Sequence, residues 1–338
     1  MYPQSCYSSG QLAASYGPLS VRMDERGASG AKAVILERNK LVSRKLVRFM
    51  TCAGFEPVAV EEPGEVKPHL AGAYLLGADA FDIEMVVEAV QAHPYLRVVL
   101  WTAEPLQRSL RYLVEHANIG NVLGRPDFDS PPRGWEIMLV LRRLLRPREE
   151  GPKFAWFLDW GFTGFQERVG DTASRDRVVG KVQRFVQHLG VRERVGELFG
   201  ELAHELLMNA MFDAPVDEYG RPKYTLDRKA NLFLPENEQP FLRLASDGTR
   251  LAIQVTDPFG TLERHHVFDG LQRGLNGGQM DRSRGGAGLG MVVCHNCTVA
   301  MFFDVIRQRK TEVTGIFDLD LSQREFRAQA KSLHYFAT

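Results

Sequence analysis

Three carboxylates and one amide recur at intervals of four residues, at Glu201, Glu205, Asn209 and Asp213. Residues four apart in a helix are neighbours on its surface, so these side chains would form one polar line. Mg²⁺ prefers oxygen ligands and usually keeps several of its waters. The line therefore indicates a magnesium-binding cleft, and the spacing alone leaves a solvated helix edge open as the alternative.

A further carboxylate follows an apolar segment. Residues 251–256 read LAIQVT, which predicts a strand, and Asp257 comes directly after it in the turn DPFG that ends at Gly260. A carboxylate at the end of a strand can accept a hydrogen bond from an exocyclic amine such as that of adenine. An isolated Asp-Pro turn would have no such meaning, so this interpretation depends on the segments around it.

One of those segments is rich in glycine. Residues 284–291 read RGGAGLGM and lead into an apolar run. Glycine allows positive φ angles and a close approach of the backbone to a ligand, and the N–H groups that begin a helix favour an anion, typically a phosphate. The spacing is not G-x-G-x-x-G, and Met291 stands where a P-loop has lysine. The stretch indicates a phosphate-binding loop, with tight packing of a helix entry as the alternative.

The segment before this loop, residues 261–285, is polar and rich in glycine. Such a composition favours a mobile lid over packed structure. We therefore expect a lid that closes over a ligand held between Asp257 and the glycine loop.

The elements that would position these residues follow from the spacing of apolar side chains. A recurrence at three and four residues predicts a helix over 191–214, and residues 298–307 and 311–319 predict an antiparallel hairpin that completes a sheet. Earlier in the chain strands and helices alternate, which implies a parallel sheet covered on both faces. The strands predicted there are 33–36, 55–60, 73–76, 97–101 and 120–123, and the helices are 41–52, 84–92, 106–116 and 135–145.

The composition excludes several classes of protein. The 338 residues have room for about two domains, and 42 Lys and Arg balance 42 Asp and Glu, so no net charge recruits nucleic acid or an anionic membrane. No segment has the ~18 uninterrupted apolar residues of a membrane span, and no signal peptide is recognisable. Four cysteines without a disulfide framework suit a reducing compartment, so we expect a cytoplasmic protein.

Together, Glu-x-x-x-Asn-Ala on a helix, Asp-x-x-Gly after a strand, the lid and Gly-x-Gly-x-Gly resemble the N, G1 and G2 boxes of the GHKL ATP-binding fold. The resemblance covers roughly residues 155–322. Members of this superfamily are histidine-kinase catalytic domains, anti-sigma serine kinases, and gyrase-type, chaperone and mismatch-repair ATPases. It implies an α/β sandwich in which helices cover one face of a mixed sheet.

The resemblance implies ATP and Mg²⁺ as cofactors. Asn209 would bind Mg²⁺ together with Glu205, and Asp257 would bind the adenine amino group. The residues that would shape the pocket and lid hinge, or meet the phosphates through the backbone, are Gly260, Gly286, Gly288, Leu289 and Gly290.

Two positions of the nucleotide site depart from the family pattern. Phe259 stands where many relatives have glycine, which would alter the adenine pocket. Asp213 stands where histidine kinases often have a basic or aromatic residue, which implies different phosphate contacts. Arg284 or Arg282 in the expected lid would supply the missing positive charge, with solvated lid arginines as the alternative.

Glu205 bears on the activity that the resemblance implies. Histidine kinases commonly have Asn or His at this position, whereas hydrolytic members and anti-sigma kinases have Glu, placed to take a proton from water or a serine hydroxyl. No histidine heads a long pair of amphipathic helices before residue 191. The resemblance therefore implies a serine/threonine kinase of the anti-sigma type, acting on an anti-anti-sigma-like or response-regulator-like partner protein.

Two other functions stay open. The first is a non-catalytic module whose protein interface responds to nucleotide, and the second is a histidine-kinase-like catalytic subunit acting in trans. A gyrase-like clamp fits less well, because the balanced charge gives no basic surplus for DNA.

Residues 31–147 resemble a response-regulator receiver, a flavodoxin-like fold with a five-stranded parallel sheet and helices on both faces. Thr102 follows the fourth strand where receivers carry a switch Thr or Ser, and Arg125 follows the fifth where they carry Lys. Gly77 stands where the phosphoacceptor Asp should end the third strand, with Asp79 at another spacing. We therefore expect no aspartyl phosphorylation, and a pseudo-receiver that docks a partner or pairs two copies of the chain.

The expected organisation is α/β throughout. An aromatic segment at residues 154–162 favours a core strand or a docking segment at the start of the second domain. The expected ranges are 1–30 for a disordered tail, 31–147 for the pseudo-receiver, 148–153 for a linker, 154–322 for the GHKL domain, and 323–338 for a polar tail with a short helix.

Overall fold

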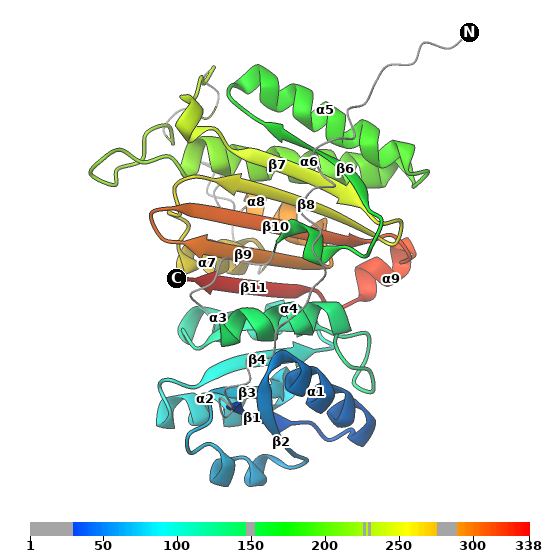
Figure 1. Cartoon of the computed structure of the whole chain (residues 1–338), viewed down its shortest axis with the longest axis vertical. Helices are drawn as coiled ribbons and strands as arrows, with labels where there is room; N and C mark the ends of the chain where they lie inside the picture. Colours follow the sequence, from blue (N-terminus) through cyan, green and yellow to red (C-terminus); the bar gives the residue numbers. More distant parts are fainter. Residues whose placement is uncertain (1–29, 147–152, 226–227, 229–230, 276–288) are drawn as a thin grey trace, which may run out of the picture. The chain divides into compact units, whose positions relative to one another are not determined.

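A mixed sheet of eleven strands runs through the described part of the chain, in the order β2-β1-β3-β4-β5-β11-β9-β10-β8-β7-β6 (Figure 1). Helices accompany it, so the α/β class is confirmed. The computed structural model describes residues 30–146, 153–225, 228, 231–275 and 289–338. The strands are β1 (Ala31–Leu36), β2 (Phe55–Val60), β3 (Leu75–Asp79), β4 (Arg97–Thr102), β5 (Ile119–Gly124), β6 (Thr163–Arg168), β7 (Phe241–Ser246), β8 (Arg250–Asp257), β9 (Ala300–Ile306), β10 (Lys310–Asp318) and β11 (Ser332–Ala337).

The first half of the sheet consists of β1 to β5, which pair in parallel in the order 2-1-3-4-5. Every residue of β3 and β5 is buried, as is typical of parallel strands covered on both faces. All strands and helices predicted between residues 33 and 145 are present, with ends that shift by a few residues. The helices of this half are α1 (Lys40–Ala53), α2 (Ile83–Ala92), α3 (Gln107–Glu115) and α4 (Gly134–Leu145).

The second half of the sheet is antiparallel except where β11 meets β9. Strands β9 and β10 form the predicted hairpin. Figure 1 shows α6, α7 and α8 behind these strands, and the Phe199 ring on α6 packs edge-on against Phe317 on β10, with 5.8 Å between the centroids. The helices of this half are α5 (Thr172–His188), α6 (Glu193–Met208), α7 (Arg264–Leu275) and α8 (Leu289–Asn296).

The C-terminal segment contains more than the expected polar tail. The short helix is present as α9 (Gln323–Ala328). Ser322 caps its N-terminus, and the Ser322 hydroxyl accepts a hydrogen bond from the N–H of Glu325. Beyond it, β11 pairs antiparallel with β5 and parallel with β9. Most of β11 is buried. The strand therefore shows no alternation of apolar and polar residues from which it could be predicted.

Buried polar contacts reinforce the junction that β11 makes between the two halves. The Arg143 guanidinium of α4 donates to both carboxylate oxygens of Asp304 on β9, at 2.6 and 3.0 Å. His334 Nε2 on β11 lies 2.8 Å from Glu136 Oε1 on α4, and both side chains are fully buried. Residues 31–338 accordingly form one compact unit. The expected linker, 148–153, lies almost entirely outside the described residues.

Two segments differ from the predictions. Helix α7 occupies the first half of the expected lid and buries Val267, Phe268 and Leu271, because these residues supply one apolar helical face. The prediction of a loose lid is therefore wrong for Arg264–Leu275, and residues 276–288 lie outside the described range. The aromatic segment begins with a 3₁₀ helix, Phe154–Phe157, rather than a strand.

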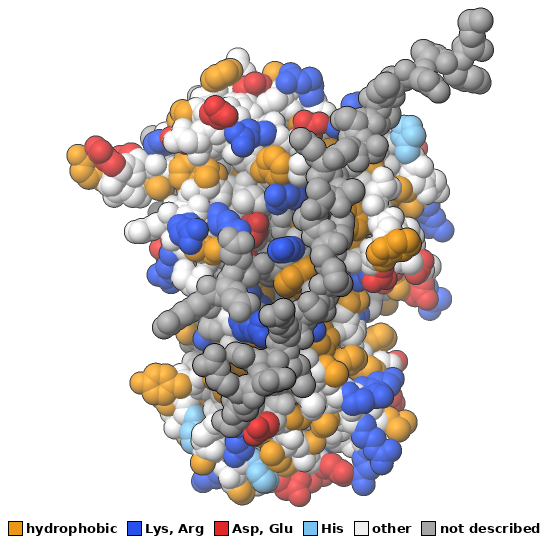
Figure 2. Space-filling view, in the orientation of Figure 1, with side chains coloured by type: hydrophobic (Ala, Val, Ile, Leu, Met, Phe, Trp, Pro, Cys, Tyr) orange, Lys and Arg blue, Asp and Glu red, His pale blue; other side chains and the backbone are white. Residues whose placement is uncertain are grey.

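The surface carries charges of both signs. On the face shown in Figure 2, basic and acidic side chains are spread over both halves of the protein, in keeping with their equal numbers in the sequence. Within the described ranges, no helix is both long enough and apolar enough to cross a membrane.

Candidate functional site

The predicted polar line lies at the C-terminal end of α6. The apolar face of this helix, which includes Leu202, is buried against the sheet, and this leaves Glu205 and Asn209 partly buried at its edge. At Asn209 the α-helix gives way to a π-helical segment, Asn209–Asp213, and the N–H of Ala214 donates to the Asn209 carbonyl at 2.9 Å. Such segments are rare and occur frequently at functional sites.

Arg228 reaches the side chains at both ends of the π-helical segment. Its Nη2 donates to Asn209 Oδ1 at 3.4 Å, its Nε donates to Asp213 Oδ1 at 3.3 Å, and Nη2 also forms an ion pair with Asp213 Oδ2. Burial raises the pKa of the Asp213 carboxyl, and the charge of Arg228 acts in the opposite direction. Arg228 could not be predicted from the sequence, because no spacing in its polar loop shows that its side chain returns to α6.

Glu205 meets the start of α8. A Cβ atom on Gly290 would lie 2.2 Å from Glu205 Oε2, so the carboxylate lies directly against the backbone of Gly290, and a side chain there would displace it. The Cys294 thiol on the same helix has a raised pKa, chiefly because it is buried and partly because of the negative charge of Glu205. A carboxylate and the first turn of a helix thus lie together, which the helix dipole favours.

Asp257 ends β8 and is only 6% exposed. Its Oδ1 accepts hydrogen bonds from the N–H groups of Phe259 and Gly260, at 2.9 and 3.3 Å. Burial outweighs these bonds and raises the pKa of the carboxyl to about 6. Gly260 has a φ of +66°, and a Cβ there would lie 2.1 Å from the Ile306 carbonyl oxygen, so this turn requires glycine.

The turn after Asp257 and the π-helical segment are joined directly. The Thr261 hydroxyl donates to the Ala214 carbonyl at 2.9 Å. Thr311, a buried residue of β10, stands opposite Asp257 in the pairing with β8 and is a second polar group beside the carboxyl. The sequence analysis did not single out Thr311, because its position opposite Asp257 depends on the register of two strands far apart in the chain.

Three predicted groups of residues therefore meet at the end of α6: the polar line, the Asp257 turn and the start of α8. Such an arrangement can hold a ligand that donates a hydrogen bond at one end and carries negative charge at the other. The roles assigned to single residues stay predictions. Leu289 is the first residue of α8, whereas Arg284, Gly286 and Gly288 lie outside the described residues.

Asn209 and Asp213 do not fit a magnesium ion in this arrangement. Their side-chain oxygens bind the guanidinium of Arg228, whose charge would repel a divalent cation at the same place. In the described ranges, no three His, Cys, Asp or Glu side chains form a group that could hold a metal ion. The positive charge at the end of α6 is therefore that of the Arg228 side chain and not that of a metal ion.

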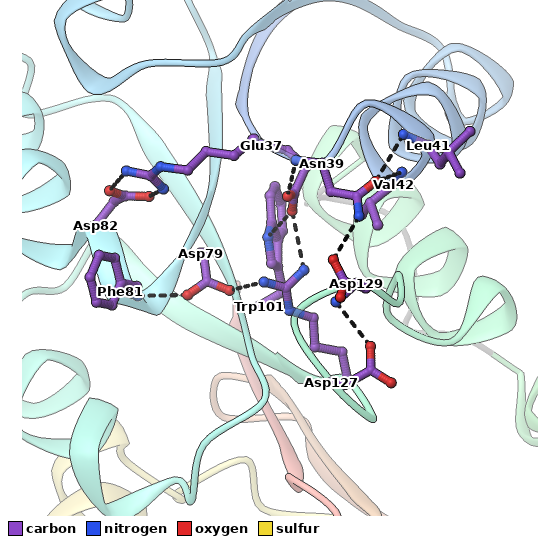
Figure 3. A network of polar contacts seen from close by, with 12 residues as sticks. Glu37, Asn39, Leu41, Val42, Asp79, Phe81, Asp82, Trp101, Asp127 and Asp129 are labelled. Atoms are coloured by element: carbon purple, nitrogen blue, oxygen red, sulfur yellow. Dashed lines mark hydrogen bonds and ion pairs between the residues drawn. The ribbon is translucent and has the colours of Figure 1, made fainter.

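A second polar network lies where β1, β3 and β5 end (Figure 3). Arg125 Nη1 lies 3.2 Å from Glu37 Oε2, and its Nη2 lies 2.5 Å from Asp79 Oδ2. Trp101 Nε1 donates to Glu37 Oε2 at 3.0 Å. Burial raises the pKa of the Asp79 carboxyl, against the effect of the Arg125 charge. The guanidinium thus bridges two buried carboxylates.

The third strand is longer than the sequence analysis predicts. Strand β3 ends at Asp79, two residues after Gly77. A Cβ on Gly77 would lie 2.8 Å from the Trp101 ring, so a larger residue at position 77 would collide with this ring. The prediction that no carboxylate stands at this strand end is therefore wrong, and Arg125 holds that carboxylate in a buried ion pair.

No protein-family model matches this chain, and a search of curated proteins found no match. Among solved structures, the chain is similar to a response regulator from Thermotoga maritima, with 11% sequence identity and a TM-score of 0.30 over 34% of this chain and 98% of that one. The α/β class stated above follows from the strands and helices of the chain itself.

Proposed function

We propose that this chain is a signalling protein that binds a purine nucleotide, ATP in the first instance, at the end of α6. The observation that carries the proposal is that described residues of the three segments resembling the N, G1 and G2 boxes of the GHKL fold lie together, with Gly290 representing the third segment. The hydrogen bond from Thr261 to Ala214 links the first two segments, and the close approach of Glu205 to Gly290 links the third.

Asp257 is the residue we assign to the nucleotide base. Its carboxyl is buried and has a pKa of about 6, so it is mostly ionised at neutral pH although burial disfavours the charge. An exocyclic amine that donates a hydrogen bond to it would stabilise the ionised form. Adenine carries such an amine, and Thr311 offers a further polar group beside it.

Glu205 is the residue we assign to proton transfer. When bound, ATP would supply its terminal phosphoryl group to a Ser or Thr hydroxyl of a partner protein and leave as ADP, and Glu205 would take the proton from that hydroxyl. The activity proposed is therefore that of a serine/threonine kinase of the anti-sigma type. Its partner would be an anti-anti-sigma-like or response-regulator-like protein.

Residues 31–147 would select that partner or pair two copies of the chain. The parallel strand order 2-1-3-4-5 is that of flavodoxin-like folds, which supports a receiver-type domain. Asp79 is only 6% exposed and forms an ion pair with Arg125, so little of its carboxylate is open to a phosphoryl donor, which supports a docking role.

A nucleotide-responsive interaction module without turnover is the second candidate. The pairing of Arg228 with Asn209 and Asp213 favours it, because phosphoryl-transfer enzymes of this kind generally use a metal ion beside the phosphates. Binding of the nucleotide would then change a protein interface, and the nucleotide would dissociate without being hydrolysed or losing its phosphate to a partner.

Calorimetric titration of ATP into the full chain tests the binding site. We expect binding to the wild type and its loss in Asp257→Asn, because an amide cannot replace the charge of the carboxylate opposite the amine. Asp320→Asn, the same chemical change at an exposed position, should bind as the wild type does. Equal binding by both variants would contradict the assignment of Asp257.

Release or transfer of the terminal phosphate of ATP separates the two candidates. For the kinase, Glu205→Gln should lower the rate by about 100-fold or more and keep ATP affinity. Glu197→Gln is the matched control, since Glu197 is exposed two turns earlier on the same helix and lies outside the proposed site. Binding without turnover in the wild type would support the interaction module.

A further inference from the structure

The loop that carries Arg228 is fixed to the protein before it reaches α6. Lys223 forms an ion pair with Glu238, and the Thr225 hydroxyl donates to the Phe212 carbonyl at 3.3 Å. Arg228 follows three residues later, and its side chain is only 22% exposed. The fold therefore positions the guanidinium beside the π-helical segment.

The contacts of Arg228 with the described residues leave its Nη1 for a ligand. Nε and Nη2 bind Asp213 and Asn209, and among the described residues Nη1 has no hydrogen-bond partner. A guanidinium presents planar, charged donors that match the oxygens of a phosphate. Asp213 would act as the positioning residue that holds this group in place.

We propose that Arg228 is the cation that contacts the phosphates in this site, and that the site binds nucleotide without a divalent metal. The proposal rests on the proposed nucleotide binding and makes it more specific. Its basis is that Arg228 already contacts Asn209 Oδ1 and both carboxylate oxygens of Asp213, so the oxygen of Asn209, the residue expected to bind Mg²⁺ with Glu205, already faces a cation. The guanidinium occupies these oxygens and so excludes a second cation from them, whereas its Nη1 can donate to an anionic phosphate oxygen.

The test is a titration of ATP into the full chain, once with excess Mg²⁺ and once with excess EDTA. We expect similar affinities in the two buffers. Arg228→Gln should weaken ATP binding by about 10- to 100-fold, the usual effect of a lost charge-assisted hydrogen bond. Arg228→Lys should keep part of the affinity, because it retains the charge and loses the planar donors.

Two controls separate a phosphate contact from a general effect of charge or folding. Arg221→Gln removes a cation of the same loop that is exposed and paired with Asp217, and it should leave the affinity unchanged. Adenosine, which has no phosphates, should bind wild type and Arg228→Gln equally well. If Arg228→Gln fails to fold, Arg228→Lys and the comparison of the two buffers still test the proposal.

The outcomes distinguish this inference from the proposed function. Binding that requires Mg²⁺ and is equal in wild type and Arg228→Gln would overturn the inference and leave the nucleotide site in place. No binding of ATP in either buffer would overturn the proposed function and the inference with it. Metal-independent binding that Arg228→Gln weakens would support both.

Discussion

At Asp257, the stability of the fold favours the protonated carboxyl group, whereas the proposed binding of a nucleotide base favours the ionised one. Burial raises its pKa from 3.8 to about 6, so the native state binds a proton more tightly than the unfolded chain does. The stabilisation from that proton is complete below about pH 4 and is lost as the pH rises through 6. Asparagine at this position would avoid this loss of stability. The fold therefore gives no reason for an aspartate here, whereas a ligand that binds the carboxylate does.

We expect Asp257→Asn to raise the free energy of unfolding at pH 7.5, by up to about 3 kcal/mol. The amide removes a buried charge and keeps an acceptor for the N–H groups of Phe259 and Gly260. At pH 4 the two proteins should be almost equally stable. Urea unfolding at both pH values measures the difference, and an effect of the same size at both would contradict the assigned cause.

At the scale of the elements, glycine fixes the turn that follows Asp257. Gly260 and Gly72 both have positive φ angles, +66° and +71°. A Cβ on Gly260 would lie 2.1 Å from the Ile306 carbonyl oxygen, whereas a Cβ on Gly72 would have nothing within 4 Å. A comparison of Gly72 with Gly260 therefore separates two costs of adding a side chain. Both positions have the backbone strain, and only Gly260 also has the close contact between the Asp257 turn and the β9–β10 hairpin.

We expect Gly72→Ala to lower the free energy of unfolding by about 1 kcal/mol, the cost of a left-handed conformation. Gly260→Ala should cost about 1–3 kcal/mol more, because it also forces atoms into a filled space. Denaturant unfolding of both variants gives the comparison. Equal losses would mean that the Ile306 carbonyl moves aside freely and that the turn is not tied to the hairpin.

Local patterns made most elements predictable, and distant contacts made the rest unpredictable. The buried runs of β1 to β5 and the apolar stripe of α6 were clear in the sequence, and so was the strand that ends at Asp257. Helix α7 carries Val267, Phe268 and Leu271 on one face, but the polar residues around them concealed it. Strand β11 lacks alternation because it is covered on both faces. The contact of Arg228 with Asn209 exists only once the loop has folded.

At the scale of the whole molecule, the helix that follows the Asp257 turn contacts the first half of the chain. Helix α7 follows the Asp257 turn, and its Arg264 donates to the carbonyls of His116 and Ile119, at 2.9 and 2.8 Å. Burial lowers the pKa of Arg264 to about 10, so this side chain stays charged at neutral pH. A rearrangement at the site would therefore act directly on the end of α3.

The buried pair of Arg143 and Asp304 should contribute strongly to the stability of this joint structure. Arg143→Ala would leave Asp304 buried without its partner, which typically costs about 3–5 kcal/mol. Arg142→Ala is the matched control, since the neighbouring Arg142 is exposed. Equilibrium unfolding in urea measures both, and a loss no larger than that of the control would contradict the role assigned to the pair.

Hydrogen exchange with and without ATP tests the central claim most directly, that three distant segments form one nucleotide site. We predict that ATP slows exchange together in peptides from the end of α6, the turn after Asp257 and the first turn of α8, and that Asp257→Asn removes all three effects. Protection that is absent, or that appears only in segments other than these, would contradict the account.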